Sequence, residues 1–190
     1  MSGKADGKAS EQRELKALQE ALAAEHAAVY GYGVVGGRIR EGRRTEARSA
    51  YDAHRARRDA LTREIRDLGG TPVAAAAAYA LPFPVPDSAA AVRLAARLED
   101  RVAGVYADVV RATAGERRRS AAEALREAAV RAVRWSGESV AFPGLAERAA
   151  TGSAPATPSA SHVPVGNGTP TVLRPPPRLV GGARGGSHPR

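Results

Sequence analysis

The sequence feature that most constrains the fold is a stripe of residues near the N-terminus, spaced by three and four positions, with a carboxylate at its centre. The stripe consists of Leu15, Leu18, Leu22, Glu25, Val29, Tyr32, Gly36 and Ile39. This spacing places its members on one face of a helix and is typical of a helix that faces the centre of a bundle. An unpaired charge is costly in such a place, so Glu25 must meet a proton, a cation or several hydrogen-bond donors.

Three further stretches show helical spacing. Ala, Arg, Glu and Leu dominate residues 11–150, and aromatic residues make up only 4% of the chain, which favours closely packed helices over a sheet. The sequence therefore predicts an all-α domain with helices over about 11–40, 45–68, 88–113 and 116–139. The inward stripe of the second helix is Ala47, Tyr51, His54, Arg58, Leu61, Ile65 and Leu68. That of the third is Val92, Ala95, Glu99, Val102, Tyr106, Val109 and Thr113.

The lengths of the connections predict the topology. The turn near 41–44 is short, so the first two helices form an antiparallel hairpin. Residues 69–87 contain Pro82, Pro84 and Pro86, which hold part of this connection extended. At full extension it spans about 60 Å, more than the roughly 38 Å of a 25-residue helix. We therefore expect a four-helix bundle with one long crossover between its second and third helices, which is the ferritin-like topology.

The second half of the first helix is rich in glycine. Each of Gly31, Gly33, Gly36 and Gly37 costs about 1 kcal/mol relative to alanine inside a helix. We interpret them as positions where a neighbouring backbone approaches closely. If the bundle itself does not cover this glycine face, it offers a surface for a symmetric homodimer.

The domain organisation follows from changes in composition. Residues 1–10 are expected to be a flexible arm, residues 11–147 the helical bundle, and residues 148–190 a disordered tail. Eight of the 13 prolines and no Asp or Glu lie in the last 40 residues, and such a segment cannot bury enough apolar surface to fold alone.

Composition also excludes several classes of function. The chain has no cysteine, which rules out disulfides and Cys-ligated metal centres. It shows no signal peptide, membrane span, P-loop or serine-nucleophile elbow, so a cytoplasmic location without a membrane partner is expected. The net charge of +9 favours at most weak, sequence-independent contact with nucleic acid, since no recognisable nucleic-acid module accompanies it.

Five polar residues on the inward stripes are the candidate site residues. They are Glu25, Tyr51, His54, Arg58 and Glu99. In a four-helix bundle these positions lie at similar heights and can meet. Carboxylate and imidazole ligands suit iron or manganese, so Glu25, His54 and Glu99 are the candidate metal ligands. Without metal, the same five residues would form a self-neutralised polar core that fixes the register of the helices.

Four segments carry a resemblance to a known family. The stretches LAAEHAAVYGYGVVGGR (22–38), AHRARRD (53–59), AYALPFPVPDS (78–88) and AFPGL (141–145) resemble the bacterial ferritin-like domain family of unknown function. The resemblance covers about residues 12–147 and implies a ferritin-like structure with no established reaction. Ferritin-like di-iron proteins place one Glu on each of two helices and Glu-x-x-His on the other two.

The set of metal ligands that this resemblance implies is incomplete in the present chain. Glu25 and Glu99 match the single glutamates, but the second helix has Tyr51 where a carboxylate would precede His54. In the fourth helix, Glu127 is followed by Val130 where a histidine is needed, and it shares the polar side of that helix with Arg131. We therefore expect a non-catalytic or ligand-binding protein without a cofactor. An iron- or manganese-dependent oxidoreductase or iron-handling protein and a weak nucleic-acid binder remain the alternatives.

Overall fold

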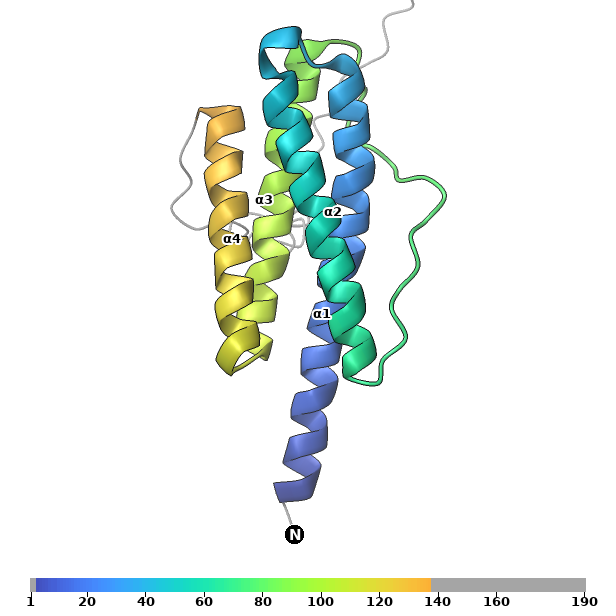
Figure 1. Cartoon of the computed structure of the whole chain (residues 1–190), viewed down its shortest axis with the longest axis vertical. Helices are drawn as coiled ribbons and strands as arrows, with labels where there is room; N and C mark the ends of the chain where they lie inside the picture. The colour runs from blue at the N-terminus through green and yellow to red at the C-terminus, as the bar shows by residue number, and fades with distance from the viewer. Residues whose placement is uncertain (1–2, 138–190) are drawn as a thin grey trace, which may run out of the picture. The chain divides into compact units, whose positions relative to one another are not determined.

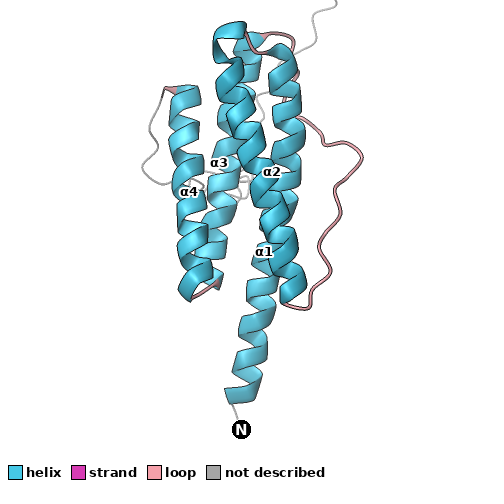
Figure 2. Ribbon diagram, viewed as in Figure 1, coloured by secondary structure: helices cyan, strands magenta, loops and turns pink. Residues whose placement is uncertain are grey.

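The computed structural model describes residues 3–137. These residues form helices that are joined by short turns and one long connection. The elements are α1 (Gly3–Arg38), the short 3-10 helix η1 (Glu41–Arg43), α2 (Arg44–Asp67), α3 (Ser88–Ala112) and α4 (Gly115–Ser136). No strand occurs among the described residues, so the prediction of an all-α chain with four helices is confirmed (Figure 2). The chain reverses direction between α1 and α2 and again between α3 and α4 (Figure 1). The tail predicted over 148–190 lies outside the described residues.

Two helix boundaries differ from those predicted. The expected helix start at Ser10 was wrong, because α1 begins at Gly3. Extending a helix that already exists adds one hydrogen bond for each residue fixed, and the Lys and Ala residues there favour this extension. At the other end, α4 stops at Ser136 because Gly137 adopts the left-handed conformation, with a φ of 76°.

The helices pack around a polar layer that divides two apolar layers. Close packing joins α1 to α2, α1 to α3 and α3 to α4, while α2 and α4 touch little. The first apolar layer includes Leu18, Leu22, Leu61, Ile65, Val102, Val109, Ala124 and Ala128. The second includes Val35, Ile39, Ala47, Ala50, Leu94, Ala95 and Trp135. Between these two sets lie the buried polar residues Glu25 of α1, His54 of α2 and Glu99 of α3, so the polar layer crosses the middle of the bundle.

The long connection between α2 and α3 lies against α1. Gln19 donates from Nε2 to the carbonyl oxygen of Thr71 at 2.6 Å and accepts from the amide of Val73 at 2.8 Å. Further along, the rings of Tyr30 and Tyr79 pack with their centroids 5.5 Å apart. The segment thus follows the outside of α1 on its way to the start of α3 (Figure 1).

The glycines of α1 differ in what surrounds them. A Cβ on Gly31 would meet Leu98 Cδ1 at 2.5 Å, whereas a Cβ on Gly33, Gly36 or Gly37 would meet nothing within 4 Å. Close approach therefore explains Gly31, through a side chain instead of the backbone that we expected. For the other three glycines that interpretation was wrong, because nothing in the described part of the chain packs on them.

This difference gives a prediction about stability. Gly36→Ala is expected to raise the free energy of unfolding by about 1 kcal/mol, because alanine is the better helix former and has room there. Gly31→Ala is the matched control and should gain less or lose stability, since Leu98 must move. Urea unfolding followed by circular dichroism measures both. Equal gains at the two positions would contradict the assigned packing.

Candidate functional site

Three of the candidate site residues meet at the centre of the polar layer. Glu25 of α1, His54 of α2 and Glu99 of α3 are each 0% exposed. The imidazole lies between the two carboxylates, with Nδ1 at 2.7 Å from Glu25 Oε2 and Nε2 at 3.2 Å from Glu99 Oε1. Each residue comes from an inward stripe of a different helix, so helix packing alone brings them together.

Two tyrosines connect the glutamates crosswise. Tyr106 of α3 donates to Glu25 Oε1 at 2.8 Å, and Tyr32 of α1 donates to Glu99 Oε1 at 2.6 Å. Trp135 of α4 in turn donates from Nε1 to the hydroxyl oxygen of Tyr32 at 2.9 Å. Each glutamate precedes the tyrosine of its own helix by seven residues, so α1 and α3 exchange equivalent hydrogen bonds. The shared spacing of Glu and Tyr in the two helices therefore has a structural role.

The fourth helix contributes a cation, Arg131, that was expected on its polar side. Arg131 Nε donates to Glu99 Oε1 at 2.8 Å, and the side chain is only 16% exposed. The expectation that Arg131 lies on the polar side of its helix was wrong. A signal was available, because Ala124, Ala128, Arg131 and Trp135 follow one another at spacings of four, three and four.

The other two candidate residues do not join this cluster. Arg58 is bound by its neighbour, since Nη2 lies 2.7 Å from Asp59 Oδ1, so the prediction that Arg58 neutralises the glutamates was wrong. Its long side chain reaches the edge of α2 from a position beside the buried face. Tyr51 is half-buried, and Arg55 lies over its ring at 5.7 Å. Neither residue has a hydrogen bond to Glu25, His54 or Glu99 within the described chain.

The cluster neutralises its own charge. Burial alone would lower the pKa of His54, but hydrogen bonds and charge interactions with Glu25 and Glu99 outweigh it and raise the pKa to about 9. Burial works to raise the pKa of Glu99, yet His54 and Arg131 hold it below the usual value. At neutral pH the imidazolium and the guanidinium therefore balance the two carboxylates.

Two polar atoms of the cluster stay without partners. Glu99 Oε1 accepts hydrogen bonds from Tyr32, His54 and Arg131, while its Oε2 is buried without a hydrogen bond. Arg131 Nη2 is likewise buried without an acceptor. Such atoms are uncommon in folded proteins and mark the part of the network nearest to α4 as incomplete.

The donor set does not fit a metal centre. Both nitrogens of His54 are bonded to the carboxylates that would be its fellow ligands, and a guanidinium lies on Glu99 where a cation would bind. Among residues 3–137, no group of three or more His, Cys, Asp or Glu side chains could hold a metal ion. The lone pairs that a metal would need from His54 and the two carboxylates are thus engaged in protonation and hydrogen bonds.

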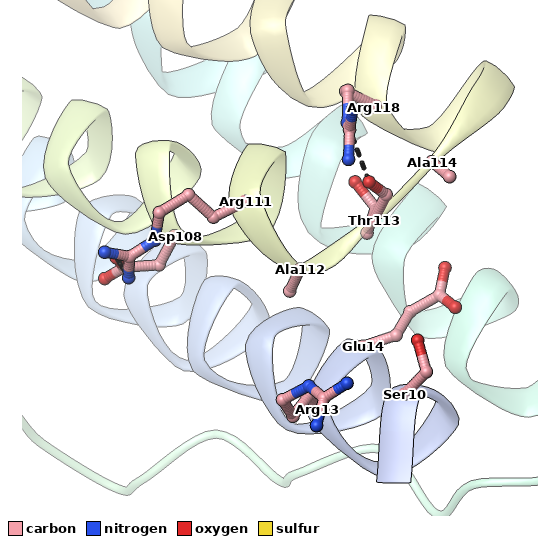
Figure 3. A pocket seen from close by; sticks show the side chains of 9 residues that line it. All are labelled: Ser10, Arg13, Glu14, Asp108, Arg111, Ala112, Thr113, Ala114 and Arg118. Atoms are coloured by element: carbon pink, nitrogen blue, oxygen red, sulfur yellow. Dashed lines mark hydrogen bonds and ion pairs between the residues drawn. The ribbon is translucent and has the colours of Figure 1, made fainter. Parts of the chain in front are cut away.

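A hollow of about 430 Å³ lies away from this cluster, at the end of the bundle where α3 turns into α4. Figure 3 shows Ser10, Arg13 and Glu14 of α1 beside Thr113 and Arg118. Arg118 Nε donates to the carbonyl oxygen of Thr113 at 2.7 Å and so stabilises the end of α3. The hollow mixes acidic and basic side chains, and nothing in it concentrates one kind of charge.

Comparison with known families identifies the domain. A family model described as Domain of unknown function (DUF4439) matches residues 17–147. The chain belongs to this family. All residues of the polar cluster fall inside the matched range, so the cluster is part of the DUF4439 domain.

One similar solved structure extends this comparison. The chain is similar to the crystal structure of a conserved hypothetical protein, Rv2844, from Mycobacterium tuberculosis, with a TM-score of 0.65 and 39% sequence identity. The match covers 66% of this chain and 96% of that chain. No curated protein matches the sequence. In the part of the DUF4439 protein that the structure describes, no helix has the length and apolar character needed to cross a membrane.

Proposed function

We propose that this DUF4439 protein is a ferritin-like bundle in which a hydrogen-bonded ion network takes the place of a di-metal centre. In this proposal the domain acts as a binding protein and not as a metal-dependent oxidoreductase. The observation that carries it is the position of His54, whose two nitrogens are bonded to Glu25 and Glu99. Arg131 then supplies the second cation that two buried carboxylates require.

The ferritin-like assignment is supported by the order and direction of the helices. Two hairpins with short turns, α1–α2 and α3–α4, are joined by the long connection that follows α1 (Figure 1). Glu25 and Glu99 occupy α1 and α3, the two helices that carry single glutamates in ferritin-like di-iron proteins. The departures lie on α2, where Tyr51 stands in place of a carboxylate, and on α4, where Val130 stands in place of a histidine.

Metal binding separates this proposal from the metal-enzyme alternative. Protein purified without an affinity tag is expected to contain no stoichiometric iron or manganese. Added Fe(II) or Mn(II) should leave the melting temperature unchanged, because a ligand stabilises a fold only by binding it. Elemental analysis and thermal unfolding provide the measurements, and Glu99→Gln is the control variant. A metal-dependent rise in the melting temperature that Glu99→Gln abolishes would overturn the proposal.

A further inference from the structure

A groove lies between the first half of α2 and the second half of α4, two helices that pack little against each other. The residues of α2 that line it are small, and include Thr45, Ser49, Ala50 and Ala53, so their side chains do not fill it. The resulting groove has a volume of about 640 Å³. Sites for small molecules commonly measure about 300–1,000 Å³. The groove therefore has the size of a ligand site.

The charges along the groove do not cancel. Both acids that line it are already paired, since Glu46 accepts from Arg43 at 2.8 Å and Glu127 accepts from Arg57 at 2.7 Å. The guanidinium groups of Arg126 and Arg134, one on each side of Val130, make no hydrogen bond or close ion pair among the described residues, although the charge of Arg126 helps to lower the pKa of Glu127. The arginines that line the groove outnumber its acids, and this excess of positive charge favours an anionic occupant.

Arg131 connects the groove to the buried cluster. Its Nε is used by Glu99, but Nη1 lies 3.6 Å from Glu127 Oε2, too far for a hydrogen bond, and Nη2 has no acceptor. Nη2 is buried, so an anion in the groove would meet Arg131 through Nη1, which makes no hydrogen bond within the described residues.

The groove also has an apolar wall. Val130 is 43% exposed, although it lies between charged residues of α4, and it lines the groove together with Ala50 and Ala53 of α2. A hydrated inorganic ion would leave this wall uncovered. An anion that carries a hydrocarbon group would cover it and gain from its burial.

We propose that this groove binds a small organic carboxylate. Its oxygens lie among Arg131, Arg126 and Arg134, and its hydrocarbon part packs on Val130 and the alanines of α2. The inference rests on the proposed function as a binding protein, and names the class of ligand. Because Arg131 also bonds Glu99, the bound carboxylate and the buried cluster share one guanidinium.

Benzoate, acetate and inorganic phosphate are the probes that test this inference on the full chain. Calorimetry and thermal unfolding in buffer with a chelator should show binding of benzoate that is tighter than that of acetate, with a rise in melting temperature. Ser49→Leu fills the groove and should abolish benzoate binding. Ala56→Leu is the matched control, because Ala56 is also exposed on α2 but lies outside the groove.

A second pair of variants tests the charge. Replacing Arg126 and Arg134 together by glutamine should weaken benzoate binding at least tenfold. Arg119→Gln changes an exposed arginine of α4 outside the groove and should leave binding intact. The inference is overturned by absence of benzoate binding, by equal binding to the Ser49→Leu variant, or by phosphate binding more tightly than benzoate. It is also overturned if sedimentation shows a dimer that Ser49→Leu dissociates, since the groove would then belong to a second copy.

The two proposals fail by different results. Uptake of iron or manganese at Glu99 would refute the metal-free cluster, while benzoate binding to the chelator-treated protein would still stand. Conversely, if the protein binds neither metal nor benzoate, the proposal of a self-neutralised cluster stands and the inference of a carboxylate site is refuted.

Discussion

Replacing Arg131 by methionine is expected to destabilise the folded protein by about 3–5 kcal/mol, the usual cost of breaking a buried ion pair. Methionine keeps much of the volume but leaves Glu99, which is 0% exposed, without its guanidinium partner. The carboxylate must then take up a proton or remain a poorly compensated charge. Urea unfolding at neutral pH, followed by circular dichroism, measures the loss.

Arg58→Met is the matched control for this experiment. Arg58 also lies on an inward stripe of the sequence, but its side chain pairs with Asp59 at the edge of α2, so its loss should change the free energy of unfolding by less than about 1 kcal/mol. A double variant, Arg131→Met with Glu99→Gln, should be more stable than the sum of the two single changes implies, because neither partner is left charged alone. A larger loss for Arg58→Met than for Arg131→Met would refute the charge assignment.

The contrast between these arginines shows what the sequence could predict about the site. Glu25, His54 and Glu99 were predicted to meet because each stands in an unbroken apolar stripe, where a polar residue has to find a partner. The spacing gives the face on which a residue lies, but it does not give the direction of a long side chain. Arg58 and Arg131 both follow the spacing of a stripe, and only packing decides that one turns to the surface and the other to Glu99.

The same reasoning applies to the fold. Periodicity and the short turns predicted four helices and the hairpin of α1 with α2. Amphipathic patterning could not predict that α2 and α4 stay apart, because Ala50 and Ala53 look like ordinary interface residues in the sequence. The ion pair of Arg57 with Glu127 joins the two helices through long side chains, and such a contact cannot be read from the spacing of residues.

The cluster should also make the stability of the protein depend on alkaline pH. The pKa of His54 rises from 6.5 in the unfolded chain to about 9 in the folded protein, so the folded state binds its proton more tightly. The stabilisation is fully present below pH 6.5 and is lost as the pH rises through 9. At about 1.4 kcal/mol for each pKa unit, the cluster loses about 3 kcal/mol over this range.

Glu99 limits the stabilisation by the cluster at acidic pH. Its pKa is lower in the folded protein than the usual 4.5, so its contribution is present above pH 4.5 and is lost as the pH falls through the folded value. The contribution of the cluster should therefore be greatest between about pH 4.5 and 6.5.

Urea unfolding of the wild type and of His54→Gln at intervals between pH 5 and 9.5 measures this dependence. Glutamine can still donate one hydrogen bond, but it cannot hold the proton that balances Glu25 and Glu99. The variant should be less stable than the wild type near pH 6, and the difference should shrink steadily towards pH 9.5. Titration of histidines or lysines elsewhere is common to both proteins and cancels in the comparison. A difference that stays constant over this range would mean that folding does not shift the pKa of His54, and would contradict the assigned charge balance.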